Sequence, residues 1–170
     1  MLGIFIFAFI INQISGNRGL FPLDSASHFD NGFRILNGEH PVKDFWIISG
    51  FIVDYMQSLL FLIFGAHWQI YVAHASLVNG LFSVFLLFFF RLIGLNFFYS
   101  VIVCLSFSIL AYPSSGTPFV DHHSSFFSLA SIICLILAIK KQNKLFWFLI
   151  PIFIMLASLS KAVPTAYFIV

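Results

Sequence analysis

Long apolar runs separated by short polar segments dominate the chain. Several of these runs approach the length of about 20 residues that a helix needs to cross a bilayer. A helix also satisfies its own backbone hydrogen bonds in hydrocarbon. The pattern therefore predicts an all-α fold, a polytopic transmembrane helix bundle forming one membrane domain over residues 1–170. The apolar runs are Leu2–Ile14, Phe45–Phe64, Trp68–Phe90, Phe97–Tyr112, Phe126–Ile139, Leu145–Leu159 and Ala162–Val170.

A polar segment, Ser15–Asp44, separates the first two runs and is rich in charged residues. Within it, residues 24–37 have the pattern of a short amphipathic helix. Asp24 or Ser25 can cap its start and Gly38 follows its end. One apolar stripe is formed by Phe29, Phe33 and Leu36.

The run Phe45–Phe64 has two interpretations. It can cross the membrane, or it can lie in the interface as an amphipathic helix. Asp54 and Gln57 lie near its centre, and a charged residue at the bilayer midplane costs roughly 2.5–3.5 kcal/mol on insertion scales. An interfacial helix avoids that cost. We therefore expect two interfacial helices in a first outer loop, residues 15–67.

Composition agrees with a membrane protein. Of the 170 residues, 61% are hydrophobic and 8% are charged, with 25 phenylalanines, whereas soluble domains carry about 25% charged residues. Mean hydropathy is +1.03. The net charge of +2 is too small to argue for nucleic acid as a partner. Cys104 and Cys134 lie inside apolar runs and indicate neither a disulfide framework nor a zinc site.

The two ends of the chain suggest a piece of a longer protein. The first run is short for a span, and the last apolar run continues to Val170 without a closing loop. We therefore expect further spans beyond this sequence.

Basic residues predict which side of the membrane each segment faces. Cytoplasmic loops carry the excess of Lys and Arg, which places Arg91 and the tight turn with Lys140, Lys141 and Lys144 in the cytoplasm. The loop Pro113–His123 then faces outward, as does the first loop. On this topology every acidic residue, and every histidine except His74, lies at the outer face.

Two acidic positions could carry chemistry at that face. Asp24 stands at a helix start, where it can act as an N-cap or as a general base or metal ligand. Asp121, His122 and His123 are adjacent, and their oxygen and nitrogen atoms suit a divalent cation. The alternative for these three residues is a solvated loop that caps the next helix.

Outward-facing basic residues also have two interpretations. Lys161 lies in a predicted outer segment, against the positive-inside tendency. It can bind an anionic lipid phosphate or snorkel to the interface, and the same alternatives hold for Arg34 and Lys43. The polar residues His74, Asn79 and Ser83 lie within a predicted span. We expect them to form hydrogen bonds to other helices, with no catalytic role.

Three stretches together resemble the GT-C superfamily of membrane glycosyltransferases, including protein mannosyltransferases, the aminoarabinose transferase of lipid A and the RgtA-like bacterial group. The first is "FRILNGEHPVKDFWIISGFIVDYMQSLLFLIFG", Phe33–Gly65, which follows Asp24. The others are "GTPFVDHHS", Gly116–Ser124, and "SLSKAVP", Ser158–Pro164. The chain departs from many members in one respect, because Asp24 is followed by Ser25 and not by a second acidic residue.

The resemblance implies transfer of a sugar from a polyprenyl-phosphate donor to a lipid, glycan or protein acceptor. Asp24 would be the general base, and Asp121 a second catalytic residue that holds a divalent cation with His122 or His123, or orients the acceptor. The donor would be bound by Lys161, Arg34, Lys43 and Asp44. The resemblance implies a bacterial inner-membrane enzyme with its active site facing outward. The rival functions are a transporter or flippase, whose charges lie near the midplane, and a purely structural subunit.

Overall fold

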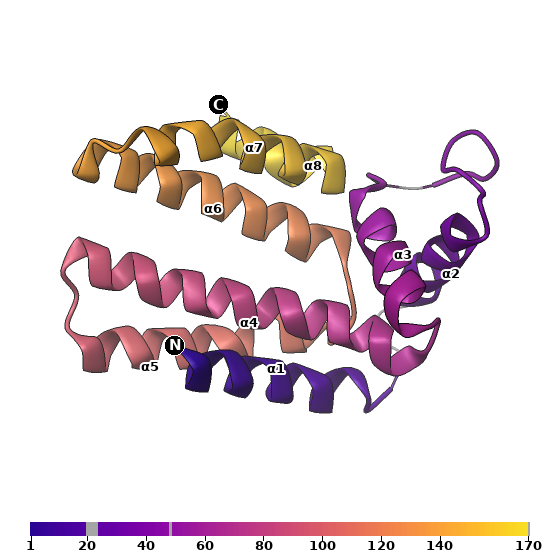
Figure 1. Ribbon diagram of the computed structural model, residues 1–170, viewed down its shortest axis with the longest axis horizontal. Helices are drawn as coiled ribbons and strands as arrows, with labels where there is room; N and C mark the ends of the chain where they lie inside the picture. Colours follow the sequence, from indigo (N-terminus) through magenta and orange to yellow (C-terminus); the bar gives the residue numbers. More distant parts are fainter. Residues whose placement is uncertain (20–23, 48, 170) are drawn as a thin grey trace. The chain divides into compact units, whose positions relative to one another are not determined.

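The computed structural model describes residues 1–19, 24–47 and 49–169, and these residues form helices and turns without a β-strand (Figure 1). Their one sheet-like feature is an isolated bridge between Pro41 and Phe45. The elements are α1 (Leu2–Gly16), α2 (Asp24–Leu36), α3 (Ile52–Phe64), α4 (Trp68–Ile93), α5 (Phe97–Leu110), the 3₁₀ turn η1 (Tyr112–Ser114), α6 (Val120–Lys141), α7 (Lys144–Ser160) and α8 (Ala162–Ile169).

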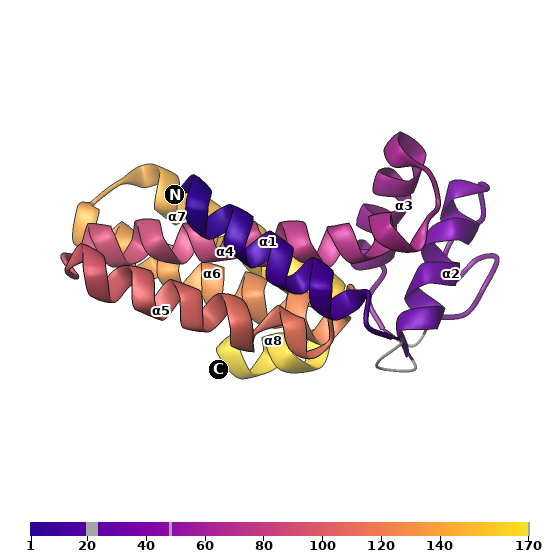
Figure 2. The same ribbon diagram turned by 90° about the horizontal axis from the view of Figure 1, so that it is seen from below.

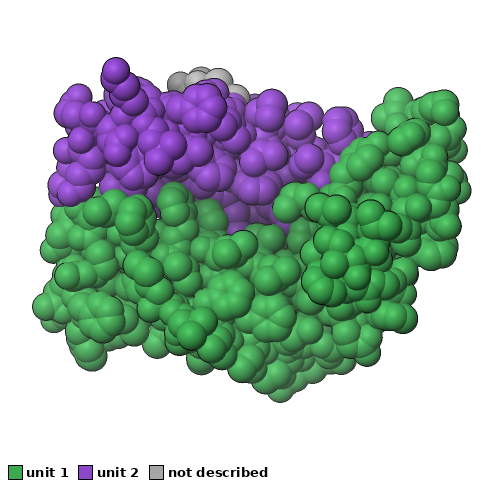
Figure 3. Space-filling model, viewed as in Figure 1, with its two compact units in different colours: residues 1–46, 53–119 green, residues 47–52, 120–170 purple. Residues whose placement is uncertain are grey.

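The chain divides into two compact units, coloured separately in Figure 3. Unit 1 comprises Met1–Trp46 and Val53–Phe119, and therefore contains α2, α4, α5 and most of α3, together with α1. Unit 2 comprises Ile47–Ile52 and Val120–Val170, with α6, α7 and α8. The sequence analysis treats all 170 residues as one membrane domain, and that remains a prediction.

In unit 1, α1 packs along α4 and α5 (Figure 2). The buried face of α1 is Ile4, Ala8, Asn12 and Gly16, one residue per turn. Gly80 of α4 lets the helices approach closely, because a Cβ there would lie 2.8 Å from the Phe5 ring. Small residues at helix contacts are typical of membrane bundles.

Polar side chains join these three helices across their contact, as predicted for Asn79 and Ser83. Asn79 donates through Nδ2 to the carbonyls of Ala8, at 3.1 Å, and Ser108, at 3.0 Å. Asn12 donates to Ser76 Oγ at 3.0 Å. The hydroxyls of Ser83 and Ser108 lie 2.9 Å apart. In hydrocarbon these groups have no water to bind, so the bonds fix the register of α1, α4 and α5.

In unit 2, α6 and α7 form a helical hairpin, and α8 packs against both. The turn between α6 and α7 carries Lys140, Lys141 and Lys144, while Asp121 begins α6 and Lys161 follows α7. One face of α6 carries the small residues Ala130, Cys134 and Ala138, all buried. The hairpin thus separates a basic end from an end with an acid and a lysine.

Three helices among the described residues are long and apolar enough to cross a membrane: α4, α6 and the stretch Phe97–Ser114, which joins α5 to η1. The shorter apolar helices are α1, α3 and α7. The predicted all-helical class is confirmed, and the predicted runs correspond closely to these elements. The sidedness of the membrane, the polytopic bundle and the interfacial location of α2 and α3 remain predictions.

Two predicted boundaries are wrong. The apolar run Phe45–Phe64 is not one helix, because α3 begins only at Ile52. Residues 39–45 fold into a turn in which Val42 N–H binds the Phe45 carbonyl at 2.8 Å.

The predicted outer loop Pro113–His123 is also shorter than expected. Helix α6 begins at Val120, so Asp121, His122 and His123 lie in its first turn.

Candidate functional site

Helix α3 buries polar side chains beside the apolar Val53 and Phe61, and it exposes large apolar side chains. Buried positions on α3 include Asp54, Gln57 and Ser58, whereas Leu62 and Phe64 are 70% and 60% exposed. A helix in water shows the opposite pattern. On α2 the buried face is Ser25, His28 and Gly32, and Phe33 of the predicted apolar stripe is 45% exposed. Phe29 of the same stripe packs against the rings of Phe61 and Tyr71, with centroids 5.0 and 5.3 Å away, so one part of the stripe is covered by protein and another part is exposed.

The centre of this contact is the Asp54 carboxylate, which is 1% exposed. Its Oδ1 lies 2.8 Å from Nδ1 of His28, a residue that is 7% exposed. Its Oδ2 accepts a hydrogen bond from Asn31 Nδ2 at 2.9 Å. A buried carboxylate is costly unless hydrogen bonds satisfy it, and here both oxygens have a partner. Asp54 thereby fixes two successive turns of α2 on α3.

A second pair joins α3 to α4. Nδ1 of His74 lies 3.0 Å from Oε1 of Gln57, and both side chains are buried. His74 was expected to bond to another helix, and this expectation is confirmed. The contact links α4 to the same face of α3 that carries Asp54.

The start of α2 is bound to the loop that precedes α6. The hydroxyls of Ser25 and Thr117 are hydrogen-bonded to each other, and both residues are fully buried. Tyr71 of α4 donates to the Ser25 carbonyl at 2.7 Å and contacts the Pro118 carbonyl at 3.4 Å. Unit 1 therefore brings together parts of the two segments predicted to form the outer loops.

Close backbone packing also holds the end of α1 against the loop that precedes α6. A Cβ on Gly16, at the end of α1, would collide with the carbonyl oxygen of Gly116. Gly116 has φ +70°, a conformation that favours glycine. Ser15 donates to the Pro113 carbonyl at 2.7 Å. The end of α1 and the loop are thus held together by direct contacts.

Asp24, the predicted general base, lies exposed in the first turn of α2, next to the buried Ser25. Asp24 thus lies beside the partial positive charge that a helix carries at its N-terminus. Asp24 also lies one turn before His28, so the two residues share one face of α2.

Asp121 and Lys161, both predicted site residues, form an ion pair in unit 2. Lys161 Nζ lies 2.8 Å from Oδ1 and 2.9 Å from Oδ2 of Asp121, and each side chain is 36% exposed. Ser124 donates to the Lys161 carbonyl at 2.9 Å, which ties the end of α7 to α6. Lys161 is therefore paired with a carboxylate, and its side chain remains partly exposed.

The other predicted metal ligands, His122 and His123, lie beside Asp121 but differ in exposure. His123 is buried and packs against Phe127, with ring centroids 6.1 Å apart, whereas His122 is half-buried. Among residues 1–19, 24–47 and 49–169, no group of three or more His, Cys, Asp or Glu side chains is arranged to hold a metal ion. The metal role of Asp121, His122 and His123 remains a prediction.

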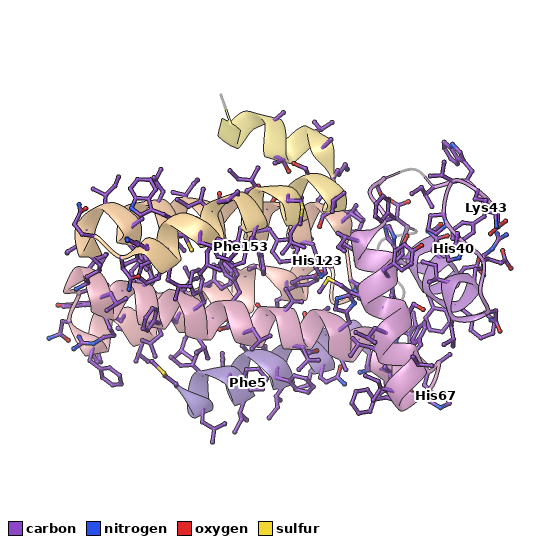
Figure 4. All side chains as sticks on the ribbon, turned by 45° about the horizontal axis from the view of Figure 1, so that its top comes forward. Phe5, His40, Lys43, His67, His123 and Phe153 are labelled. Atoms are coloured by element: carbon purple, nitrogen blue, oxygen red, sulfur yellow. The ribbon has the colours of Figure 1, made fainter. Side chains whose placement is uncertain are left out.

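The remaining predicted donor-binding residues lie in or next to the turn after α2, where Figure 4 shows Lys43 pointing away from the ribbon. Arg34 is paired with Glu39 at 2.6 Å, and its guanidinium lies 4.5 Å from the centroid of the Phe45 ring. Asp44 accepts from the His40 backbone N–H at 2.8 Å. Lys43 is 75% exposed and lies 3.7 Å from Asp44. Lys43 is thus the more available cation of this turn.

Sequence analysis missed the roles of His28, Asn31 and Asp54. The signal for Asp54 was present, since a carboxylate in an apolar run requires a partner. Its partners lie 23 and 26 residues away, on a helix that folds back onto α3. Comparisons with protein-family models, with curated proteins and with solved structures find no match to this chain.

Proposed function

We propose that this chain is part of a membrane glycosyltransferase that moves a sugar from a polyprenyl-phosphate donor to an acceptor hydroxyl at the outer face of a bacterial inner membrane. The observation that carries the proposal is the Asp121–Lys161 pair at the end of the α6–α7 hairpin opposite its basic turn. A leaving lipid phosphate needs a cation at the membrane surface, and Lys161 is a positioned cation that is still partly exposed.

The reaction assigns a separate role to each residue. As the acceptor oxygen bonds to the anomeric carbon, its proton passes to the Asp24 carboxylate. The bond between that carbon and the phosphate oxygen breaks, and its electron pair leaves with the lipid phosphate. The Lys161 ammonium stabilises this charge. An ammonium has three N–H donors, so Asp121 can orient Lys161 while a phosphate oxygen takes a further donor.

The contacts of α2 support the role of Asp24. Its neighbour Ser25 is bound to Thr117, and its helix is fixed on α3 through His28, Asn31 and Asp54. A general base has to be held near its target. Asp24 lies on a helix attached at two points, so its backbone is well positioned while its side chain stays exposed.

Transfer from a labelled polyprenyl-phosphate sugar, measured with the full-length protein in vesicles, tests the proposal. We expect Asp24→Asn to lower kcat about 10²–10⁴-fold and Lys161→Gln about 10²–10³-fold. Asp30→Asn is the matched control, because Asp30 is exposed on the same helix, and it should keep the wild-type rate. Wild-type rates in the Asp24 and Lys161 variants would remove both residues from the mechanism.

Transport is the second candidate, and the buried His28–Asp54 pair favours it, since ionisable groups in the interior of membrane proteins often mark ion pathways. The same vesicles distinguish the two functions. An enzyme releases unlabelled polyprenyl phosphate and forms a labelled product, whereas a flippase moves the intact donor between leaflets without breaking a bond.

A further inference from the structure

An apolar groove lies in unit 1 between the end of α1 and the end of α5 with η1. Its volume of about 370 Å³ falls within the range of roughly 300–1,000 Å³ that is common for ligand sites. The residues of α1 that line it recur at helical spacing and so form one face of that helix. The full lining is Ile11, Ile14, Ser15 and Arg18 on one side, and Ile109, Leu110, Pro113 and Ser114 on the other.

The apolar walls of the groove are open to the surroundings. Ile14 is 47% exposed, Ile109 48% and Leu110 76%. Helix α1 packs on α4 through the adjacent stripe, which includes Ala8 and Asn12. The groove is therefore formed by side chains that helix packing leaves uncovered, in a part of unit 1 that we expect to lie in the membrane.

Arg18 places a positive charge at one end of this groove. It lies just beyond the last turn of α1 and is exposed. Among the described residues no carboxylate pairs with it, since the recorded ion pairs are those of His28, Arg34, Lys43 and Lys161. The negative end of the α1 dipole attracts the Arg18 guanidinium. This attraction uses none of the guanidinium N–H donors, so they can bind an anion.

The hydroxyls in the lining do not compete with Arg18 for an anion. Ser15 donates to the Pro113 carbonyl at 2.7 Å, and Ser114 donates to the Ala111 carbonyl at 2.9 Å. Each hydroxyl has a single proton, which these bonds use. The groove therefore offers one cationic donor group at its end and apolar walls along its length.

We propose that this groove binds an anionic phospholipid, with its phosphate on Arg18 and one acyl chain along Ile11, Ile14, Ile109 and Leu110. An acyl chain matches the apolar walls, and a phosphodiester with one negative charge matches a single guanidinium. Arginine suits this role because its planar fork binds two phosphate oxygens at once. Phospholipid is also the most abundant amphiphile in a membrane, so mass action favours it.

Photo-crosslinking tests the proposal. The full-length protein is placed in phosphatidylcholine vesicles that contain a small share of phosphatidylglycerol with a photoreactive acyl chain. Mass spectrometry then locates the labelled peptides. We expect labelling at residues 11–18 and 109–114, stronger than with the same probe on phosphatidylcholine. Arg18→Gln should lower it about fivefold, since one basic residue near the surface contributes about that factor.

Three variants complete the experiment. Arg18→Lys keeps the charge and should keep most of the labelling. Lys43→Gln is the matched control, because it removes an exposed cation of unit 1 that does not line the groove, and it should label as the wild type does. Leu110→Trp fills the groove and should reduce labelling from both probes.

Unchanged labelling in Arg18→Gln would overturn the proposal, as would equal labelling by the two headgroups. Displacement of the probe by an equal concentration of polyprenyl phosphate would also overturn it, and would assign the groove to that lipid. Activity is not the readout, so the result is independent of whether sugar transfer is confirmed.

Discussion

At the residue scale, the buried carboxylate of Asp54 is the centre of the contact between α2 and α3. A carboxylate at 1% exposure would be costly without partners, and it has two, His28 and Asn31. Removing Asp54 leaves the buried His28 without this bond, and removing His28 leaves Oδ1 of Asp54 without one, which costs more than the bond itself contributes. The cluster therefore determines how α2 and α3 fit together.

The first stability prediction concerns this cluster. We expect Asp54→Ala and His28→Ala each to lower the free energy of unfolding by about 1–3 kcal/mol, because each leaves a buried polar partner unsatisfied. The double variant should cost less than the sum of the two single variants. Denaturant unfolding of the detergent-solubilised protein measures these changes. Asp30→Ala, at an exposed position of the same helix, should have a small effect, and strictly additive losses would show that His28 and Asp54 act separately.

Sequence alone identified single residues better than their partners. The polar positions of α3 and the need of Lys161 for an anionic partner were visible in the pattern. The partners were not visible, because Asp54 meets His28 and Lys161 meets Asp121 only after helices fold back on one another. The sequence leaves Lys161 two interpretations, a lipid phosphate or the interface, and among the described residues it is paired with a carboxylate 40 residues earlier in the chain.

At the element scale, the close approach of α2 and α3 depends on Gly32. A Cβ at this position would lie 2.9 Å from Cγ and 3.2 Å from Cβ of Gln57. Gln57 is itself buried and bound to His74, so it has little room to move. An added methyl group would push α2 away from α3 and stretch the bonds to Asp54.

We therefore expect Gly32→Ala to destabilise the protein by about 1–3 kcal/mol, the usual cost of overpacking, despite the better helix propensity of alanine. The measurement is the thermal unfolding midpoint. Gly3→Ala is the control, since Gly3 is helical and nothing lies within 4 Å of its added Cβ, and it should be neutral or stabilising. A stabilised Gly32→Ala protein would mean that α2 and α3 are packed more loosely than described.

Element boundaries were predicted well where a span ends in polar residues, and poorly where an apolar run contains a turn. The segment from Phe45 to Phe64 is mostly apolar, yet Phe45 is buried beneath the Arg34 guanidinium and the helix begins seven residues later. Periodicity reports which residues are apolar. It does not report that a nearby cation and a backbone turn hold the first of them out of the helix.

At the scale of the whole molecule, the charges of unit 2 lie at opposite ends of one hairpin. Lys140, Lys141 and Lys144 surround its turn, and Asp121 and Lys161 lie at its open end. Helix α6 is long enough to cross a membrane. By the positive-inside tendency, we expect the basic turn to face the cytoplasm.

Cysteine labelling of intact cells tests this orientation in a Cys104→Ala/Cys134→Ala background, which removes the buried native thiols. We expect Lys43→Cys to react with a membrane-impermeant maleimide from outside, and Gln142→Cys to react only after permeabilisation. Both positions are exposed. Labelling of both from the same side would refute the predicted topology and, with it, the outer-face site.

The bond between Ser25 and Thr117 has a consequence for biosynthesis. These residues are 92 positions apart, and ribosomes add roughly 5–20 residues per second. Helix α2, which carries Ser25, is thus synthesised about 5–20 seconds before Thr117 emerges from the translocon. During that interval the Ser25 hydroxyl, which is fully buried in the folded protein, lacks its partner, so quality control of this protein would act first on the start of α2.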